Sequence, residues 1–140
     1  MTRAGREAVR VARIKGIGGV FFKAQNPLEM SAWYKKHLDV PAGEDGTAMF
    51  PWRDAETAKE EHMTVWAPFP ADTDYFDPTT APFMVNYIVE DLDGLLEQLR
   101  ADGVWVDEKR ENHEYGRFAW IKDPEGRRIE LWEPPPPSEP

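Results

Sequence analysis

The stretch DPEGRRIELWEP, residues Asp123–Pro134, holds a tight turn followed by a strand. Asp, Pro and Gly in close succession favour a β-turn at residues 123–126. Beyond it, Ile129 and Leu131 alternate with Glu130 and Trp132, and this period of two predicts a strand over Arg128–Glu133. A second strand, predicted over Arg117–Lys122, precedes the turn. The chain therefore ends in two neighbouring strands, the last of which carries a carboxylate among apolar residues.

The residues before these two strands have the patterns of a strand and of a helix that follows it. Phe83–Val89 (FMVNYIV) is apolar and predicts a strand. Asp91 is suited to cap a helix in which leucines recur at positions 92, 95, 96 and 99, the spacing of one helical face. Gly103 suits a left-handed turn at the helix end, and Val104–Val106 predicts another short strand.

The first half of the chain repeats this order. Ile17–Ala24 predicts a strand, Asn26 and Pro27 predict the start of a helix, and apolar and aromatic residues continue at helical spacing to Leu38. The two caps, Asn26 and Asp91, lie 91 − 26 = 65 residues apart. Residues 64–68 (TVWAP) align with residues 130–134 (ELWEP) at an offset of 130 − 64 = 66. Similar offsets at both ends predict a duplicated module.

Composition excludes several classes of protein. The 140 residues carry a formal charge of −9, which repels nucleic-acid phosphates and anionic lipid, so we expect neither nucleic acid nor a membrane as partner. Cysteine is absent, which excludes disulfides and thiolate chemistry. Residues 1–15 hold no apolar run long enough for a signal peptide, so we expect a cytoplasmic protein whose residues 1–15 form a mobile arm. Residues 135–140 are expected to be a disordered proline-rich tail.

The closing DPEGRRIELWEP and the opening NPLEMSAWYKKHL resemble motifs of the vicinal-oxygen-chelate superfamily, which includes glyoxalases, bleomycin-resistance proteins and extradiol dioxygenases. The resemblance implies an α+β fold of two tandem βαβββ modules, residues 16–75 and 80–134, within one domain spanning 16–134. It implies a curved mixed sheet with helices outside and a ligand cleft on the concave face. It also implies a homodimer.

Metal-dependent members of this superfamily place ligands on the first and last strand of each module. Carried onto this chain, those positions fall on Gly19, Thr64, Met84 and Glu130. Only Glu130 can bind a divalent ion well, and one carboxylate cannot hold a catalytic metal against water. We therefore expect no metal and no other cofactor. The remaining route to a metal site is recruitment of His62 or His113 beside Glu130, while His37 falls on the outer helix.

Strand alternation from these positions predicts which side chains face the cleft. The expected ligand-binding residues are Phe21, Lys23, Trp66, Asn86, Phe118, Trp120 and Trp132, and Glu130 is the expected catalytic residue. The alternatives are that the aromatic residues are core, that Lys23 extends to solvent, and that Glu130 forms a structural ion pair.

Three functions are consistent with these features. The first is a glyoxalase/bleomycin-resistance-like protein that binds a small aromatic or amphipathic molecule in an aromatic-lined cleft without the usual metal. The second is a lyase or isomerase of the glyoxalase type, with Glu130 as general base or as a metal ligand. The third is an interaction module whose cleft is filled by its own side chains.

Overall fold

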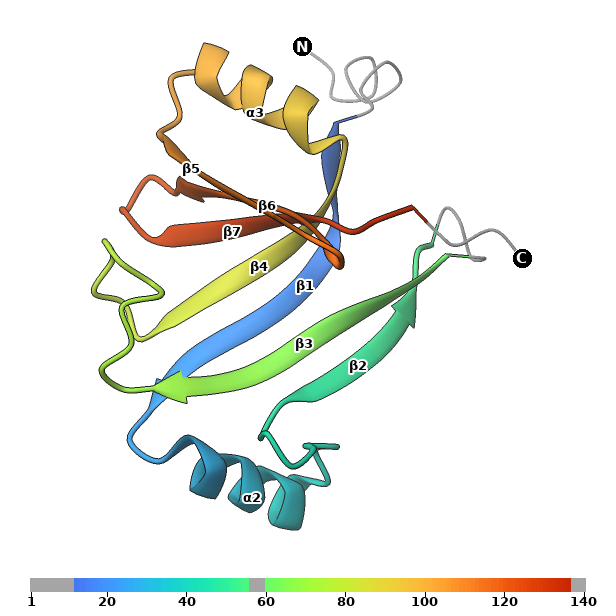
Figure 1. Cartoon of the computed structure of the whole chain (residues 1–140), viewed down its shortest axis with the longest axis vertical. Coiled ribbons are helices and arrows are strands. Elements are labelled where there is room, and N and C mark those ends of the chain that lie inside the picture. The colour runs from blue at the N-terminus through green and yellow to red at the C-terminus, as the bar shows by residue number, and fades with distance from the viewer. Residues whose placement is uncertain (1–11, 56–59, 137–140) are drawn as a thin grey trace.

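One curved sheet of seven strands runs through the computed structural model, which describes residues 12–55 and 60–136 (Figure 1). The strand order across the sheet is β2-β3-β1-β4-β7-β6-β5. The elements are β1 (Arg13–Ala24), α2 (Pro27–Leu38), β2 (Ala48–Arg53), β3 (Glu61–Pro70), β4 (Phe83–Glu90), α3 (Leu92–Ala101), β5 (Val106–His113), β6 (Gly116–Lys122) and β7 (Arg128–Glu133).

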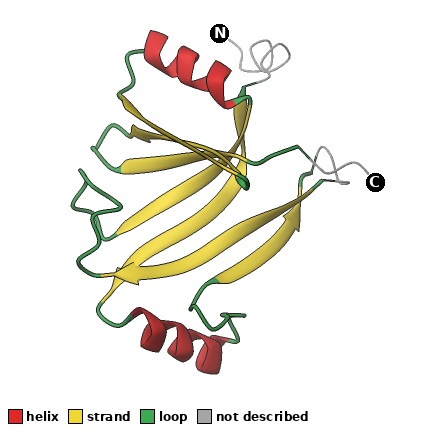
Figure 2. Cartoon of the chain, in the orientation of Figure 1, coloured by secondary structure: helices red, strands yellow, loops and turns green. Residues whose placement is uncertain are grey.

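The two halves of the chain meet in the middle of this sheet. The first strands of the halves, β1 and β4, pair antiparallel, and each is flanked by the last strand of its own half in parallel. Helices α2 and α3 lie at opposite ends of the molecule, as Figure 2 shows. The α+β class, the curved mixed sheet and the tandem arrangement predicted from the sequence are thereby confirmed.

The first half has one strand fewer than predicted among the described residues. Strand β5 of the second half would correspond to residues 40–47 at the offset of 66, and that stretch forms turns instead. Pro41 lacks a backbone donor, and Gly46 has a φ of 84°, so neither supports a regular ladder. The edge strand of the first half is therefore β2.

Two strands are longer than the sequence indicated. Strand β1 begins at Arg13 rather than Ile17, so it includes the last residues of the predicted arm. Strand β5 runs from Val106 to His113, well beyond the short strand predicted at Val104–Val106. The rest of the predicted arm, residues 1–11, and residues 137–140 of the predicted tail lie outside the described residues.

Helix α3 packs on the sheet as its leucine pattern predicts. The Asp91 side chain accepts a hydrogen bond from the Gly94 backbone N–H (3.2 Å), and Leu92, Leu95 and Leu96 are buried. They contact the outward-facing residues of β4, β6 and β7, among them Val89 and Leu131. In contrast, α2 buries only Ser31. Neither helix in the described segments has the length and apolar character needed to cross a bilayer.

The inner, concave face of the sheet carries a second cluster. Its buried part comes from four strands and the loop after β3, and consists of Phe21, Ala67, Phe76, Met84, Phe118 and Trp120. Because strand residues alternate between faces, the residues packing on α3 and those of this inner cluster come from the same strands. The inner cluster borders the candidate site.

Candidate ligand-binding site

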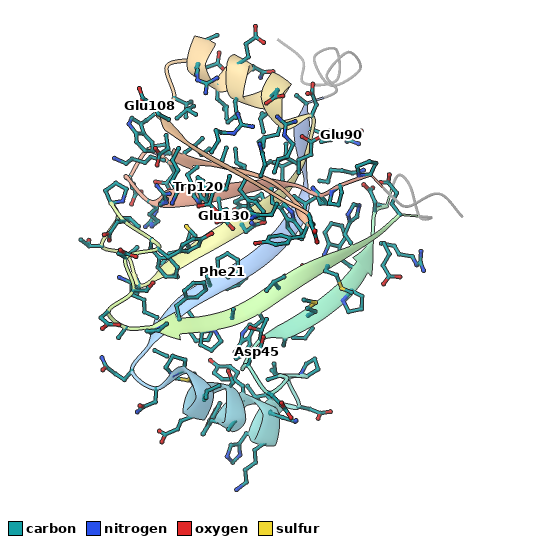
Figure 3. All side chains as sticks on the ribbon, in the orientation of Figure 1. Phe21, Asp45, Glu90, Glu108, Trp120 and Glu130 are labelled. Carbon is teal, nitrogen blue, oxygen red and sulfur yellow. The ribbon has the colours of Figure 1, made fainter. Side chains whose placement is uncertain are left out.

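A pocket of about 220 Å³ opens on the inner face, against β1, β4, β6 and β7. Strand β5 and the loop between β3 and β4 also contribute to its wall. Figure 3 shows Phe21, Trp120 and Glu130 in the region between the two helical ends. The lining residues are Gly18, Phe21, Val65, Tyr75, Asn86, Glu111, His113, Tyr115, Phe118, Glu130 and Trp132.

Glu130 lies at the base of this pocket and is only 1% exposed. Its Oε1 accepts a hydrogen bond from Asn86 Nδ2 (2.7 Å), and its Oε2 accepts from Trp120 Nε1 (2.9 Å) and from the Tyr75 hydroxyl. Burial raises the pKa of the Glu130 carboxyl above its ordinary value, although these three hydrogen bonds oppose the rise. The carboxyl is thus held in place and is easier to protonate than an exposed glutamate.

Asn86 stands beside Glu130 because β4 and β7 pair in parallel with these two residues as direct neighbours. Its side chain is 1% exposed, and its amide oxygen Oδ1 has no hydrogen-bond partner among the described residues. A Cβ added at Gly18 would clash with that oxygen. The Asn86 amide therefore lies over a glycine that leaves space for it.

Tyr75 closes the pocket from the loop between β3 and β4. Its ring stacks on Phe69 with centroids 5.5 Å apart and an interplanar angle of 13°, and its hydroxyl donates to Glu130. Burial, followed by the nearby Glu130 charge, raises the pKa of the Tyr75 phenol, so the phenol remains a donor at ordinary pH. No strand or helix pattern points to this residue, because it lies in an irregular loop between β3 and β4.

Rings form the outer wall of the pocket. Phe118 and Trp132 are parallel, with centroids 5.8 Å apart and 5° between their planes. The Trp132 indole N–H is fixed by donation to the Tyr115 backbone oxygen (2.7 Å). His113 stacks on Tyr115 at 4.9 Å, and its Nε2 lies 2.9 Å from Glu111. Phe118 and Trp132 were among the expected ligand-binding residues, whereas Glu111 and Tyr115 were not.

Trp66 was expected to face the cleft and does not. Its ring lies 5.0 Å from Tyr34 of α2 and 5.3 Å from Phe22, on the outer face. Strand β3 pairs with β1 so that Val65 stands opposite Gly19, and Val65 lines the pocket. The offset of 66 thus placed β3 one residue out of register, which exchanged its two faces.

Two other expected residues lie near the pocket without lining it. The Lys23 ammonium is 5.6 Å from the centroid of the Phe76 ring. Trp120 is fully buried, and its ring centroid lies 5.1 Å from the Lys109 ammonium and 5.0 Å from the Arg128 guanidinium. Trp120 therefore holds the carboxyl in place from behind the pocket wall.

The residues at the inherited metal positions do not fit a divalent ion. Gly19 pairs with both Val65 and Asn86, and Asn86 pairs with Glu130, so these four are neighbours on the sheet. Thr64 turns to the Ile17 backbone, and Met84 is buried in the inner cluster. The one carboxylate in this row already accepts hydrogen bonds from three donors, which leaves about one of its roughly four lone-pair sites free, and a divalent ion needs several strong ligands.

His62 does not approach Glu130. Its ring packs against Trp52 with centroids 4.8 Å apart and the planes tilted by 37°, beside Asp54, which follows β2, and Glu60, which precedes β3. Those three side chains are close enough to share an ion, but the Lys15 ammonium lies 2.8 Å from Asp54 and 2.9 Å from Glu60. Lys15 thus supplies the positive charge in this group. Of the two histidines considered for recruitment, only His113 lines the pocket.

Solved structures share this fold at low sequence identity. Methylmalonyl-CoA epimerase from Mycobacterium tuberculosis is 20% identical, with a TM-score of 0.55 over 94% of this chain and 96% of that one. A Streptomyces coelicolor methylmalonyl-CoA epimerase variant, in complex with 2-nitronate-propionyl-CoA, is 13% identical, with a TM-score of 0.64 over 91% and 100%. A member of the glyoxalase/bleomycin resistance protein/dioxygenase superfamily from Vibrio splendidus is 8% identical, with a TM-score of 0.52 over 87% of this chain and 98% of that one. These likenesses establish the fold.

No curated protein matches the chain significantly. The family model described as Glyoxalase/Bleomycin resistance protein/Dioxygenase superfamily matches residues 20–131, from the first strand through the strand that carries Glu130. This span includes both halves of the sheet and nearly the whole pocket wall. The chain therefore belongs to the glyoxalase/bleomycin resistance protein/dioxygenase superfamily.

Proposed function

We propose that this chain is a small-molecule binding protein of the glyoxalase/bleomycin-resistance kind, which holds a small aromatic or amphipathic molecule without a metal centre. The observation that carries the proposal is a pocket of about 220 Å³ whose wall is aromatic and whose base is the buried Glu130–Asn86 pair. Such a combination of apolar walls and a few fixed polar groups is typical of ligand sites.

The aromatic wall is arranged before any ligand arrives. Phe118 and Trp132 are parallel, and the Trp132 ring is fixed by its hydrogen bond to the Tyr115 backbone. The free-energy cost of ordering these rings when a flat ligand stacks on them would therefore be small. The open volume beside them also favours a binding site over a cleft filled by the protein's own side chains.

The metal-free part of the proposal follows from the donors around Glu130. Tyr75, Asn86 and Trp120 all present N–H or O–H groups to the carboxyl. A divalent ion in the same place would displace these donors and would find no imidazole or second carboxylate in the row of Gly19, Val65 and Asn86.

A lyase or isomerase that uses Glu130 as a general base is the second candidate. The raised pKa of the Glu130 carboxyl, within a pocket, is the observation that favours it. Only the lyase or isomerase would remove a proton from its bound molecule; the binding protein would not. A bound carbonyl compound incubated with the protein in D2O should gain deuterium at its acidic carbon if Glu130 is a base, and no deuterium if the protein only binds.

Stabilisation by ligands tests the proposal. We expect planar aromatic compounds to raise the melting temperature of the chain, since a ligand at 100 times its Kd adds about 2.7 kcal/mol to folding. Phe118→Leu keeps an apolar side chain but removes the stacking surface, so affinity should fall by up to about tenfold. Phe50→Leu, on the exposed edge strand β2, is the matched control and should have no effect.

Two results would overturn the proposal. One is an aromatic panel that leaves the melting temperature unchanged at millimolar concentration. The other is a ligand that binds the Phe118 and Phe50 variants equally well, which would place its site elsewhere on the protein.

A further inference from the structure

The amide oxygen of Asn86 is a buried acceptor without a donor. Asn86 Nδ2 donates to Glu130 Oε1, which turns Oδ1 away from the carboxyl and toward Gly18 in the pocket wall. No described residue donates to this oxygen. An unpaired buried acceptor is costly, and most such atoms in folded proteins are paired. A donor supplied by a ligand would satisfy it.

Glu130 adds a negative charge at the same place. In the described residues its hydrogen bonds come from the neutral groups of Tyr75, Asn86 and Trp120. The guanidinium on the same strand, Arg128, instead pairs with Asp107 at 2.9 Å. Within residues 12–55 and 60–136, the charge of Glu130 therefore has no ion-pair partner in direct contact.

The second carboxylate in the pocket wall is already paired. Glu111 lies 2.9 Å from His113 and 3.2 Å from Lys109, and the hydrogen bond with His113, followed by the contact with Lys109, lowers the pKa of the Glu111 carboxyl. Glu111 thus keeps an ionised carboxylate at the pocket rim. Lys109 itself is about half exposed and does not line the pocket.

Building on the proposed function, we propose that the ligand carries a positively charged hydrogen-bond donor, of the amidinium, guanidinium or ammonium class, which binds Glu130 and the unpaired Asn86 Oδ1. Its aromatic part stacks on Phe118 and Trp132. A planar cation with two or more N–H groups suits this pair, because one group can reach each acceptor. An anionic ligand would instead meet Glu130 and an acceptor oxygen, both of which repel it.

Trp120 fixes how the Asn86–Glu130 pair responds to loss of the charge. The indole N–H can only donate, so the carboxyl atom beside it must remain an acceptor. If Glu130 is protonated or replaced by glutamine, the new donor must therefore lie on the other side, facing Asn86. Asn86 then turns its oxygen toward residue 130 and its NH2 toward the pocket. Neutralising Glu130 changes the pocket base from acceptor to donor.

The same reasoning gives the direction of the pH dependence. The titratable or charged groups around Glu130 are Tyr75 from the loop after β3, Arg128 from β7, and Lys109, Glu111 and His113 from β5. The raised pKa of the Tyr75 phenol keeps it neutral between pH 5 and 8. Affinity for the cation should fall as the pH decreases through the titration of Glu130, while affinity for a neutral ligand of the same shape should not.

Three probes of one shape test the inference by calorimetry on the full chain: benzamidinium, benzamide and benzoate. At pH 7.5 we expect benzamidinium to bind at least tenfold more tightly than benzamide, and benzoate to bind weakest. Glu130→Gln should weaken benzamidinium binding at least tenfold and should leave benzamide binding equal or stronger. Glu97→Gln, an exposed residue of α3, removes the same charge far from the pocket and should change neither.

The possible results separate the inference from the proposed function. Benzamide or benzoate bound as tightly as benzamidinium, or benzamidinium binding unaffected by Glu130→Gln, would overturn the cation inference and leave an aromatic binding site. Failure of all three probes, with failure of other aromatic compounds, would overturn the proposed function itself. If Glu130→Gln does not fold, the wild-type chain between pH 5 and 8 decides: equal pH profiles for benzamidinium and benzamide would refute the inference.

Discussion

Glu130 is a buried carboxyl whose hydrogen-bond partners in the described part of the chain are neutral donors, so its charge should make the fold sensitive to pH. Burial raises the pKa of Glu130 in the folded protein, and the folded state therefore holds this proton more tightly than the unfolded chain does. The resulting stabilisation is complete below the ordinary glutamate pKa of 4.5 and is lost as the pH rises through the raised value.

Glu130→Gln removes this penalty and should be at least as stable as the wild type above that pH range. The advantage should be about 1.4 kcal/mol for each unit by which folding raises the pKa, because the glutamine amide can donate to Asn86 Oδ1. Glu130→Leu leaves three donors unpaired and should lose about 3 kcal/mol or more. Urea denaturation from pH 4 to pH 8 measures both. A glutamine variant that is less stable at every pH would show instead that the charged carboxylate stabilises the fold.

Gly18 provides the space in which the Asn86 amide lies. A Cβ there would contact Asn86 Oδ1 and would lie 2.8 Å from Ile88 and 3.0 Å from Trp132. Gly18→Ala should therefore displace Asn86 from Glu130 and cost about 1–3 kcal/mol. Gly43→Ala is the control, since the nearest atom to an added carbon there is 3.7 Å away. Equal melting temperatures for the two variants would show that the pocket base tolerates the added methyl group.

At the scale of elements, the loop between β3 and β4 completes the site through Tyr75. Its hydroxyl stabilises the ionised form of Glu130, so Tyr75→Phe should raise the pKa of that carboxyl further. Stability should then begin to decline over the same range from pH 4.5 but continue to decline to a higher pH, with a loss of about 1 kcal/mol at neutral pH. Tyr115→Phe, which removes the same atom from an exposed ring, should match the wild type. Identical pH profiles would show that the Tyr75 bond is unimportant.

The strands that carry Glu130, Asn86 and Phe118 could be predicted because each alternates cleanly between an apolar outer residue and an inner one. Trp66 was assigned to the wrong face because the sequence offsets of 65 and 66 differ by one residue, and one residue exchanges the faces of a strand. Tyr75 could not be predicted because it lies in a loop, where side chains follow no regular pattern. The full length of β5 could not be predicted because its residues (VDEKRENH) are mostly charged and show no alternation of apolar and polar positions. Their positions depend on contacts between distant parts of the chain.

For the molecule as a whole, the first expectation is independence from metal. Protein purified without added metal should carry no stoichiometric divalent ion at Glu130, and EDTA should change neither the melting temperature nor benzamidinium affinity. Elemental analysis checks this. An ion lost in Glu130→Gln would contradict the proposal. An ion lost only in His62→Ala would belong to the Asp54–Glu60–His62 group beside Lys15.

The second whole-molecule expectation is a homodimer. Met49 and Met63, on the same face of β2 and β3, are large apolar side chains with exposed fractions of 54% and 37%, at the end of the sheet where the first half lacks a fourth strand. Strand β2 is also an open edge, which proteins usually cover. A second copy of the chain is the partner we expect there, because an apolar surface is one on which two copies of charge −9 can meet without placing like charges together.

Charge substitution tests this location. Met63→Lys should convert the dimer to a monomer in light scattering at high micromolar concentration, because an isolated ammonium would be buried in the interface. Leu28→Lys, on the exposed face of α2, adds the same charge on another exposed apolar side chain and should leave the dimer intact. A wild-type chain that is monomeric at this concentration would refute the dimer. A dimer that persists in Met63→Lys and dissociates in Leu28→Lys would move the interface to α2.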